Sequence, residues 1–516
     1  MKKILVLILA LTLIAAIPAM AVEVELPILA EKQTFTIWVD KEDLCQNSWA
    51  DKECVKFTEE QTNIHVEWVE VPHTGWQEKV NLAFASGDLP DAFIGSADGV
   101  DVVSNMDVLA PLDEIIDSGV APNIQQMFED LPELRGALTV SDGHIYSLPI
   151  GDADVKNEIN GELWINTVWL DNLGLSMPTT LDEFYDVLVA FRDGDPNGNG
   201  DTTDEIPLLV SASSDAAKID GLFGFFGTLE NDYHVRIQDG QVIFTPQEDG
   251  YFEALQWLHK LYSEGLINKE YFTEDYQQFL AKGNSETCIA GVFCEWYIDN
   301  LMLASYVPDY TYLTPFEGTL WSPNGTPNTP QGTLNGFVIT NACANPEALV
   351  RWYDYINSDL DILNLWNYGP EGEIWRYLDD GRWEVFTDNV PEGSSSSQVR
   401  RTLGTGPRAP LYAYYRFRGA DVEKFADRIT AKVEANEAYK PFLPAENLVN
   451  GFGDAEEESE RNMLLLDINL YLEKFKASAV VDGITEEQWA EHLKVLEGLS
   501  IDEYVGYWQT YYDAHK

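Results

Sequence analysis

The segment 195–205, DPNGNGDTTDE, contains the clearest candidate for a metal-binding motif in this chain. Asp195, Asn197 and Asn199 occupy its first, third and fifth positions, and Gly200 occupies the sixth. This pattern is the first half of an EF-hand loop, in which a hard cation collects several oxygens from a tightly turning backbone. The twelfth position holds Ile206 instead of Glu, so a shorter loop must supply the closing carboxylate.

These oxygen donors suit Ca²⁺ in a structural role, which would pin the loop and offset the repulsion among its carboxylates. The closing carboxylate would come from Asp204 or Glu205, and Asp201 would add its backbone carbonyl or its side chain. The alternative is a metal-free turn of Gly and Asn between a helix and a strand. The predicted calcium ligands are Asp195, Asn197, Asn199, Asp201, Asp204 and Glu205.

A second cluster is basic, in a chain with 32 Lys and Arg against 87 Asp and Glu. Five arginines fall within residues 400–418, and three tyrosines are interleaved with them. Guanidinium groups bind carboxylates or polyol hydroxyls and stack on aromatic rings, so this segment could hold a charged or heavily hydroxylated ligand. The alternative is a set of structural ion pairs with the abundant acidic side chains. The residues are Arg400, Arg401, Arg408, Arg416 and Arg418, with Tyr412, Tyr414 and Tyr415 between them.

The elements that would position such groups follow an α/β pattern based on largely parallel sheets. Strands are expected at Thr34–Val39, Ile64–Val71 and Asp91–Gly95, with helices at residues 53–61 and 76–85 between them. Strand after helix at this spacing predicts three parallel strands by residue 95. Further helices are expected at 181–191, where Thr180 can form the N-cap, and at 251–264, 346–357 and 486–499. Val338–Thr340 and Cys288–Glu295 are expected to return into earlier sheets, and Gly393–Ser397 to form a surface loop.

Composition limits the function classes. Of the 516 residues 45% are hydrophobic, which is enough to bury the cores of two large lobes. The net charge of −55 and the pI near 4.2 argue against nucleic acid and anionic membrane surfaces as partners, since both would repel this chain. Seven scattered histidines and five cysteines show no zinc-binding spacing. Cys45 and Cys54 could close a disulfide loop, whereas Cys288, Cys294 and Cys343 are expected to be buried free thiols.

The first residues predict export. Two lysines precede an almost wholly apolar run at residues 4–17, and Ala19-Met20-Ala21 offers small residues at the cleavage positions, so residues 1–21 are interpreted as a signal peptide. The apolar run is shorter than the ~20 residues that a membrane-spanning helix needs. No cysteine near the cleavage site could carry a lipid. We therefore expect a secreted, soluble chain in the periplasm or another extracytoplasmic space.

The ordered series TFTIWV, WQEKVNLAFASGDLPDAFIG, LAPLDEIID, DGHIYSLP and LWINTVWLDNLGLSMPTTLDEF resembles the extracellular solute-binding proteins of family 1, which serve ABC importers. The likeness covers nearly the whole mature chain and is to the branch with lipoprotein and alginate-binding members. It implies a periplasmic-binding-protein-like type II fold, in which a hinge joins two α/β lobes around a ligand cleft. It also implies a calcium ion away from the sugar, and no catalysis. The first lobe would comprise residues 22–149 and 312–390, and the second 150–311 and 391–516.

A sugar has weakly apolar ring faces edged by hydroxyls, so its binder needs flat aromatic rings together with carboxylate, amide or arginine groups. Trp296, after the strand GVFCE, is the first stacking candidate, because open α/β sheets present ligand-binding residues at strand ends. Maltose-type relatives carry a tryptophan under a sugar ring at the corresponding place. For each aromatic residue the alternative is core packing, and for each charge it is a solvated loop. The other candidates are Asp98, Asp40, Lys41, Trp76, Tyr368, Trp375, Arg408, Tyr412 and Arg416.

We therefore expect a monomeric, non-enzymatic binding protein that captures a carbohydrate, in the first instance an oligosaccharide, and delivers it to the permease subunits of an ABC importer. Two alternatives stay open. A secreted glycoside hydrolase would share the acidic, aromatic composition and would need a pair of carboxylates about 5–10 Å apart. A calcium-dependent glycan-binding adhesin would be expected to have repeats or an anchoring segment, and neither is visible in the sequence.

Overall fold

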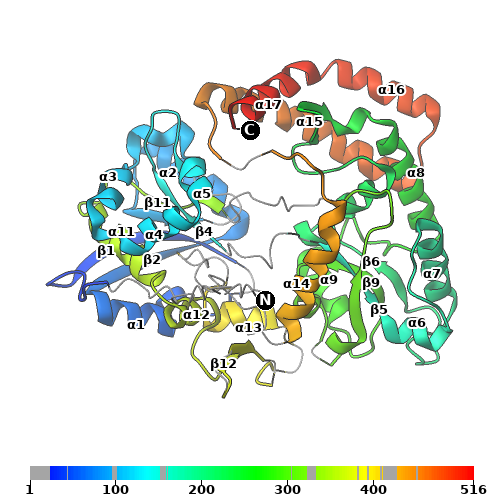
Figure 1. Cartoon of the computed structure of the whole chain (residues 1–516), viewed down its shortest axis with the longest axis horizontal. Coiled ribbons are helices and arrows are strands. Elements are labelled where there is room, and N and C mark those ends of the chain that lie inside the picture. The colour runs from blue at the N-terminus through cyan, green and yellow to red at the C-terminus, as the bar shows by residue number, and fades with distance from the viewer. Residues whose placement is uncertain are drawn as a thin grey trace, which may run out of the picture.

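The computed structural model describes residues 24–42, 45–95, 101–151, 159, 161–303, 305–321, 333–379, 383–386, 388–391, 394, 396–406, 410, 427–448 and 451–515. The predicted signal peptide lies outside these residues. The described chain forms two lobes, each around its own β-sheet (Figure 1). Among the described residues, no helix combines the length and the apolar character that crossing a bilayer requires.

The sheet of the first lobe has the strand order β2-β1-β3-β11-β4. Strand β1 pairs in parallel with β2 and β3, which confirms the three parallel strands expected by residue 95. Strand β11 arrives from far along the chain and pairs antiparallel with β3 and β4, as expected for the segment around Val338. The strands are β1 (Gln33–Lys41), β2 (Ile64–Pro72), β3 (Ala92–Ile94), β4 (Ser147–Ile150) and β11 (Thr333–Ile339).

Helices cover this sheet because their apolar faces join one core with the strands, as Ile37, Phe337 and Trp352 illustrate. The predicted helices at 53–61, 76–85 and 346–357 are confirmed as α1 (Glu53–Thr62), α2 (Trp76–Ser86) and α11 (Pro346–Ile356). The others are α3 (Asp113–Ile115), α4 (Pro122–Asp130), α5 (Pro132–Leu138) and α12 (Leu360–Tyr368), with the 3-10 segment η3 (Val103–Val108).

The sheet of the second lobe has the order β10-β5-β9-β6 and corrects one expectation. Strand β5 pairs antiparallel with both β9 and β10, and only β6 with β9 is parallel, so this sheet is not largely parallel. Cross-strand pairing depends on the route of the chain between strands, and the strand pattern itself does not contain that information. The strands are β5 (Glu162–Asn166), β6 (Ile206–Leu209), β9 (Ala290–Glu295) and β10 (Tyr310–Leu313).

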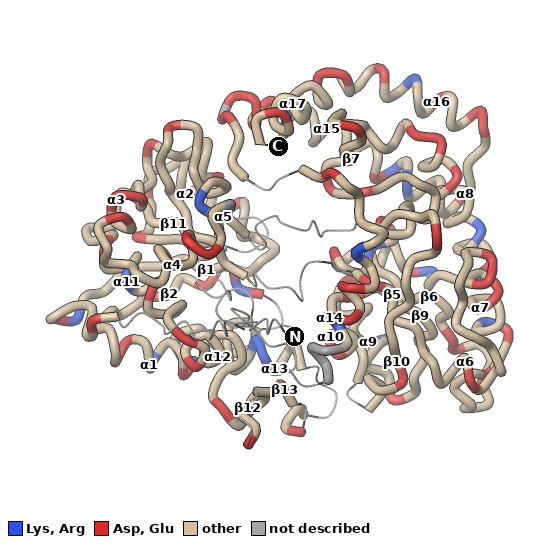
Figure 2. Tube along the Cα trace, viewed as in Figure 1, with Lys and Arg blue, Asp and Glu red and all other residues tan. Residues whose placement is uncertain are grey.

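The helices of the second lobe include the remaining predicted ones, α7 (Leu181–Asp193), α8 (Asp249–Ser263) and α16 (Glu486–Glu497). As predicted, the Thr180 hydroxyl accepts a hydrogen bond from the Glu183 backbone N–H at 3.2 Å and caps α7. Acidic residues are spread along the outer helices (Figure 2). The other helices of the second lobe are α6 (Thr167–Leu173), α9 (Tyr276–Gly283), α10 (Ile298–Leu301), α14 (Asp427–Tyr439), α15 (Ala455–Asp482) and α17 (Ile501–His515). This lobe also contains a hairpin formed by β7 (Val235–Gln238) and β8 (Gln241–Phe244).

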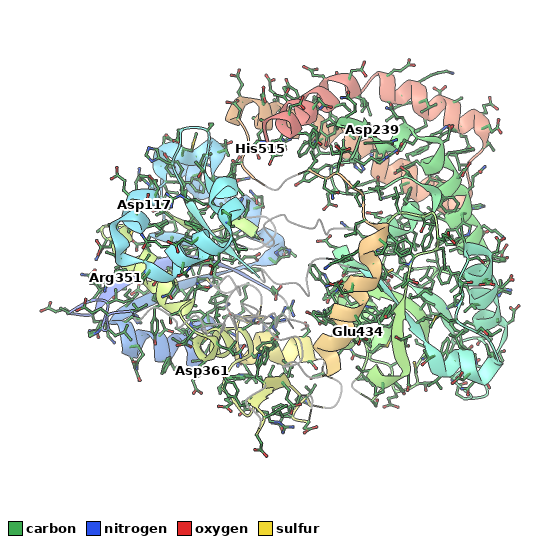
Figure 3. All side chains as sticks on the ribbon, in the orientation of Figure 1. Asp117, Asp239, Arg351, Asp361, Glu434 and His515 are labelled. Carbon is green, nitrogen blue, oxygen red and sulfur yellow. The ribbon has the colours of Figure 1, made fainter. Side chains whose placement is uncertain are left out.

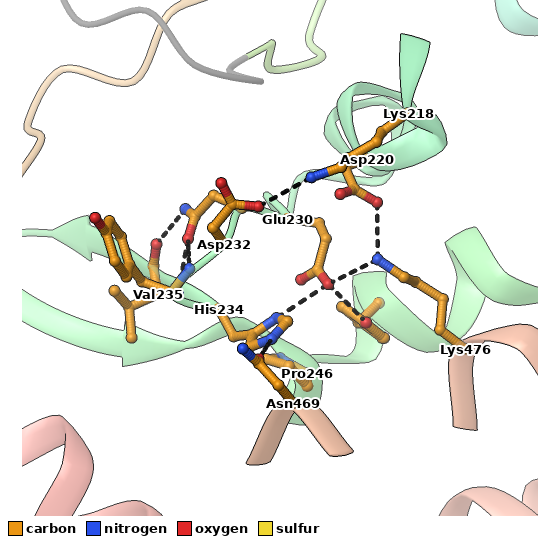
Figure 4. Close-up of polar contacts among 12 residues, drawn as sticks. Lys218, Asp220, Glu230, Asp232, His234, Val235, Pro246, Asn469 and Lys476 are labelled. Carbon is orange, nitrogen blue, oxygen red and sulfur yellow. Dashed lines mark hydrogen bonds and ion pairs between the residues drawn. The ribbon is translucent and has the colours of Figure 1, made fainter. Parts of the chain in front are cut away.

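A buried polar network attaches the C-terminal helices to the second lobe (Figure 4). The Lys476 amine of α15 donates to Asp220 at 2.8 Å and to Glu230 at 3.3 Å, and Glu230 also pairs with His234 Nδ1 at 3.0 Å. Burial alone would raise the pKa of Glu230, but the charges of His234 and Lys476 lower it to about 2. The carboxylate is therefore ionised and paired inside the protein.

Helix α13 (Ser396–Leu403) corrects the prediction that Gly393–Ser397 is a surface loop, because Ser396 and Ser397 are buried and begin a helix. The buried Lys52 amine holds the C-terminal end of α13 against the first lobe. It donates hydrogen bonds to the carbonyls of Arg401, Thr402 and Gly404 at 2.8, 3.0 and 2.6 Å. A small hairpin, β12 (Trp375–Tyr377) and β13 (Trp383–Val385), precedes this helix.

Two observations bear on the remaining expectations. Leu313, Phe316 and Trp321 belong to the second core and Leu334 to the first, so the chain re-enters the first lobe later than the expected boundary at 312. The other lobe boundaries stay predictions.

All five cysteines are free, so the disulfide considered for Cys45 and Cys54 is not formed.

Candidate functional site

The first lobe presents charged side chains where β1 ends. Asp40 is buried, and its carboxylate oxygens lie 3.0 and 3.2 Å from His73 Nδ1. Lys41 pairs with Glu70, whose carboxylate also accepts hydrogen bonds from Ser48 Oγ at 2.6 Å and the Trp49 N–H at 2.7 Å. The strand therefore delivers Asp40 and Lys41 to its carboxyl end, as expected, but each already has a partner from a neighbouring element.

The second lobe presents Glu295 and Trp296 where β9 ends. Glu295 is buried, and its carboxylate accepts hydrogen bonds from the Trp296 N–H at 3.0 Å, from Asn300 at 3.4 Å and from Ser214 at 3.5 Å. Burial raises the pKa of Glu295, although these donors and Arg401 oppose the rise. Trp296 itself is half-buried, at the strand end where the sequence predicts it.

Helix α13 links the end of β1 in the first lobe to the end of β9 in the second. Arg401 forms an ion pair with Glu42, which directly follows β1, and it also donates to the Ser397 hydroxyl. The charges of Glu295, Arg401 and Glu42 all act on the hydroxyl of Tyr276, at the start of α9, whose pKa burial raises. We call Glu42, Arg401, Tyr276, Glu295 and Trp296 the strand-end site. It contains residues from both lobes, and its carboxylates, guanidinium and aromatic rings could bind hydroxyl groups and apolar ring faces.

Three of the predicted aromatic ligands lie elsewhere. Trp76 is 1% exposed and packs edge-on against Phe93, with ring centroids 6.3 Å apart. Tyr368 is 2% exposed under the guanidinium of Arg400, and Trp375 is 3% exposed and donates to the Gly369 carbonyl at 2.7 Å. Their rings are covered by the protein core, so we withdraw these three residues from the site. The predicted ligands Asp98, Arg408, Tyr412 and Arg416 lie outside the described residues.

The strand-end site includes residues that sequence reasoning missed. Glu42 and Tyr276 stand in segments without a motif, and Arg401 was noted only as part of the arginine cluster. Glu295 gave one signal that could have identified it, because it is the single charge in the apolar strand AGVFCE. A charged residue at the end of a buried strand either needs partners or faces a ligand.

The predicted calcium loop joins the end of α7 to the start of β6. Its backbone turns twice through positive φ, at Gly198 (72°) and Gly200 (87°), where glycine avoids strain. The turns are closed by the N–H of Gly200 donating to Asp195 Oδ2 at 3.0 Å and that of Asn199 donating to Asn197 Oδ1 at 3.0 Å. The six predicted ligands are thus gathered in one short loop.

Several buried carboxylate oxygens of this loop lack hydrogen-bond partners among the described residues. Asp195 Oδ1 and both carboxylate oxygens of Glu205 are buried without a hydrogen-bond partner among the described residues. Burial and the nearby Asp204, Asp195 and Asp201 raise the pKa of Glu205 to about 7. Within the described ranges, no three carboxylate, imidazole or thiol groups converge as a metal cluster. The amide of Asn199 instead holds Asp204 Oδ2 at 2.7 Å. These orphaned oxygens fit a hard cation that would pull the loop's donors inward.

Comparison with known proteins identifies the family. Residues 43–359 match the family model described as bacterial extracellular solute-binding protein. The fructooligosaccharide ABC transporter substrate-binding protein FusA of Streptococcus pneumoniae serotype 4 is 30% identical over 507 residues, which cover 95% of this chain and 91% of FusA. Lipoprotein LipO of Bacillus subtilis is 27% identical over 405 residues, 75% of each chain.

Comparison with solved structures indicates the same family. FusA in complex with kestose superimposes with a TM-score of 0.79 at 28% identity and covers 94% of this chain and 99% of that chain. A FusA EF-hand mutant in complex with fructo-nystose gives the same TM-score, identity and coverage. The alginate-binding protein AlgQ2 without calcium ion, at 22% identity, has a TM-score of 0.71 over 94% of this chain and 99% of its own, which shows the fold alone. The chain therefore belongs to the bacterial extracellular solute-binding proteins and has their periplasmic-binding-protein-like fold of two α/β lobes.

Proposed function

We propose that this protein is the substrate-binding component of an ABC importer, which captures an oligosaccharide between its lobes outside the cytoplasm and delivers it to a membrane permease. Family membership and the likeness to FusA over 95% of the chain support this function. Because FusA is named as a fructooligosaccharide-binding component and has a solved structure in complex with kestose, these sugars are the first ligands to test here.

The observation that carries the proposal is the strand-end site, in which Arg401 of α13 forms an ion pair with Glu42, directly after β1 of the first lobe, and in which Glu295 and Trp296 lie where β9 of the second lobe ends. The Trp296 ring would cover the apolar face of a sugar, and Glu295 and Arg401 would bind its hydroxyl groups. A ligand in contact with both lobes gains most of its binding energy when the lobes are close. That differential affinity shifts the population toward the closed form, which the permease would recognise.

Calorimetric titration of the purified mature chain with kestose, followed by mass spectrometry of any sugar released gently from the protein, tests this function. The expected result is saturable binding and recovery of the sugar unchanged. Shortened labelled oligosaccharides after incubation would instead support a glycoside hydrolase. A released peptide or metal chelate, with no binding of any glycan, would refute the substrate class.

The same proposal includes a structural calcium ion in the loop 195–205. The buried, partnerless oxygens of Asp195 and Glu205 support it, and the FusA form described as an EF-hand mutant indicates that a relative has such a loop. Asp195, Asn197, Asn199, Asp201, Asp204 and Glu205 would hold the ion. A bound divalent charge would offset the repulsion among these carboxylates and fix the connection between α7 and β6.

A further inference from the structure

Three histidines in the described part of the first lobe each pair through Nδ1 with a carboxylate. The pairs are His65 with Glu59 at 2.6 Å, His73 with Asp40 at 3.0 Å and His144 with Asp113 at 3.1 Å. The three histidine side chains are similarly exposed, at 41, 41 and 44%. The pairs therefore share their chemistry and their exposure, and they differ in their place in the sheet.

His73 lies at the edge of the first sheet that faces the second lobe. Strand β1 begins on the outer side of the first lobe, close to Ile28, whose carbonyl accepts a hydrogen bond from Arg351 (labelled in Figure 3). The other end of β1 leads to Glu42, which pairs with Arg401 of α13, a helix between the two lobes (Figure 1). Because β1 and β2 are parallel, β2 ends at this same edge, and His73 directly follows it.

The strand register makes His73 a neighbour of the strand-end site. Lys41 of β1 pairs with Pro72 of β2, so the next residues along the two strands, Glu42 and His73, lie side by side. Neighbouring strands are about 4.8 Å apart, a spacing that one sugar unit can bridge. A ligand that reaches Glu42 is therefore also within reach of His73.

The other two histidines lie at the opposite edge. His65 is the second residue of β2. His144 precedes β4, and β4 runs in the same direction as β3 and β1, because β3 and β4 both pair antiparallel with β11. Ligands of open α/β sheets bind at the carboxyl ends of the strands, not at the amino ends. Of the three histidines, His73 alone is placed to meet a ligand between the lobes.

Asp40 fixes the imidazole of His73. The carboxylate is 2% exposed, and its two oxygens lie 3.0 and 3.2 Å from Nδ1. A carboxylate only accepts hydrogen bonds, so Nδ1 carries the proton, and in the neutral ring Nε2 is an acceptor. A hydrogen bond to one ring nitrogen sets the tautomer and the orientation of the other. Since the ring is partly exposed, Nε2 has room to accept a hydrogen bond from a ligand.

We propose that His73 is a sugar-binding residue of the first lobe, whose Nε2 accepts a hydrogen bond from a ligand hydroxyl group and whose orientation Asp40 sets. The inference rests on the proposed function and adds a residue that determines specificity. A site that forms a hydrogen bond with a substrate hydroxyl group discriminates against analogues without that group. His73 would therefore require a free hydroxyl group at one position of the bound sugar.

Two substitutions of His73 separate ligand binding from a structural role. The side-chain amide of Asn can occupy the position of Nδ1, and that of Gln can occupy the position of Nε2. His73→Asn therefore keeps a donor for Asp40 but has no acceptor for the sugar, whereas His73→Gln has an amide oxygen available to the sugar. Position 73 is exposed, so both variants should fold.

Calorimetric titration with kestose tests the inference. His73→Asn should lose about fivefold in affinity, as expected for one hydrogen bond, with an unchanged Tm. His73→Gln should recover part of this loss. His65→Asn is the matched control, because His65 belongs to the same strand and has the same exposure and the same kind of partner. This control should bind kestose as the unmodified protein does.

Each other outcome overturns the inference. Unchanged affinity in both His73 variants would show that the imidazole only pairs with Asp40, and it would leave the proposed function intact. A loss of the same size in His73→Gln would show that the Nε2 position does not bind the ligand. Equal losses in His65→Asn and His73→Asn would show that the effect does not depend on the edge of the sheet. If the unmodified protein bound no fructooligosaccharide at all, the fructan form of the proposed function and the inference would fail together.

Discussion

Acidification should destabilise the protein through His492, which is buried in α16. Its Nε2 donates to the Pro246 carbonyl at 2.8 Å, so its Nδ1, 2.8 Å from the hydroxyl of Tyr471, is the acceptor in the neutral ring. The ring is stacked on Phe475, with centroids 3.8 Å apart. Burial lowers the pKa of His492 from 6.5 to about 4, because little water can reach a charged imidazole there.

The sign and size of the effect follow from linkage. The pKa of His492 is lower in the folded than in the unfolded chain, so its contribution to stability is fully present above pH 6.5 and is lost as the pH falls toward 4. The whole difference corresponds to about 3 kcal/mol, at roughly 1.4 kcal/mol per pH unit. Between pH 7.5 and pH 5 the unfolded chain takes up the proton and the folded chain does not, which costs about 2 kcal/mol.

Urea unfolding of the unmodified protein and of His492→Gln across this pH range measures the effect. Other groups also titrate, but they contribute equally to both proteins, so the difference between the two free energies of unfolding isolates His492. That difference should shrink by about 2 kcal/mol from pH 7.5 to pH 5, to the disadvantage of the unmodified protein. Parallel curves with a constant difference would show that His492 does not cause the loss of stability at low pH.

Three further predictions concern the calcium loop, the strand-end site and the buried network. Calcium added to chelator-treated protein at about 100 times its Kd should stabilise the protein by about 2.7 kcal/mol in a thermal melt. Asp195→Asn should abolish this gain in stability. Asp186→Asn, on the exposed face of α7, is the control and should keep it. Trp296→Ala should weaken kestose binding at least about tenfold in calorimetry with an unchanged Tm, and wild-type affinity in this variant would remove the residue from the site. Lys476→Met should lower the free energy of unfolding by about 3–5 kcal/mol, because it removes the buried cation that Asp220 and Glu230 share, and His234 then has to balance Glu230 without it. Lys494→Met, at an exposed ion pair, should change it by less than about 1 kcal/mol, and equal losses in the two lysine variants would contradict that account.

Local sequence patterns are enough to predict many of the individual helices and strands and the pairing of the first three strands. The βαβ spacing before residue 95 and the N-cap at Thr180 are confirmed, because each depends on contacts within a few residues or on a short crossover. The calcium loop at 195–205 stays a prediction. The ordered resemblance of the whole chain to a family also supplied the two-lobe fold. Neither kind of signal reports how a particular side chain is covered.

The strand pairing of the second sheet and the set of residues in the strand-end site depend on long-range packing. The antiparallel pairing of β5 with β9 joins segments separated by more than a hundred residues, and the route between them is set by packing. Trp76 and Trp296 are both tryptophans next to a strand or helix end, yet one is enclosed by the core and the other is half-buried at a strand end. Likewise, Glu42 and Arg401 meet only because α13 is fastened to the first lobe. The burial and the partners of a side chain depend on the elements that fold against it, and a sequence pattern records only its near neighbours.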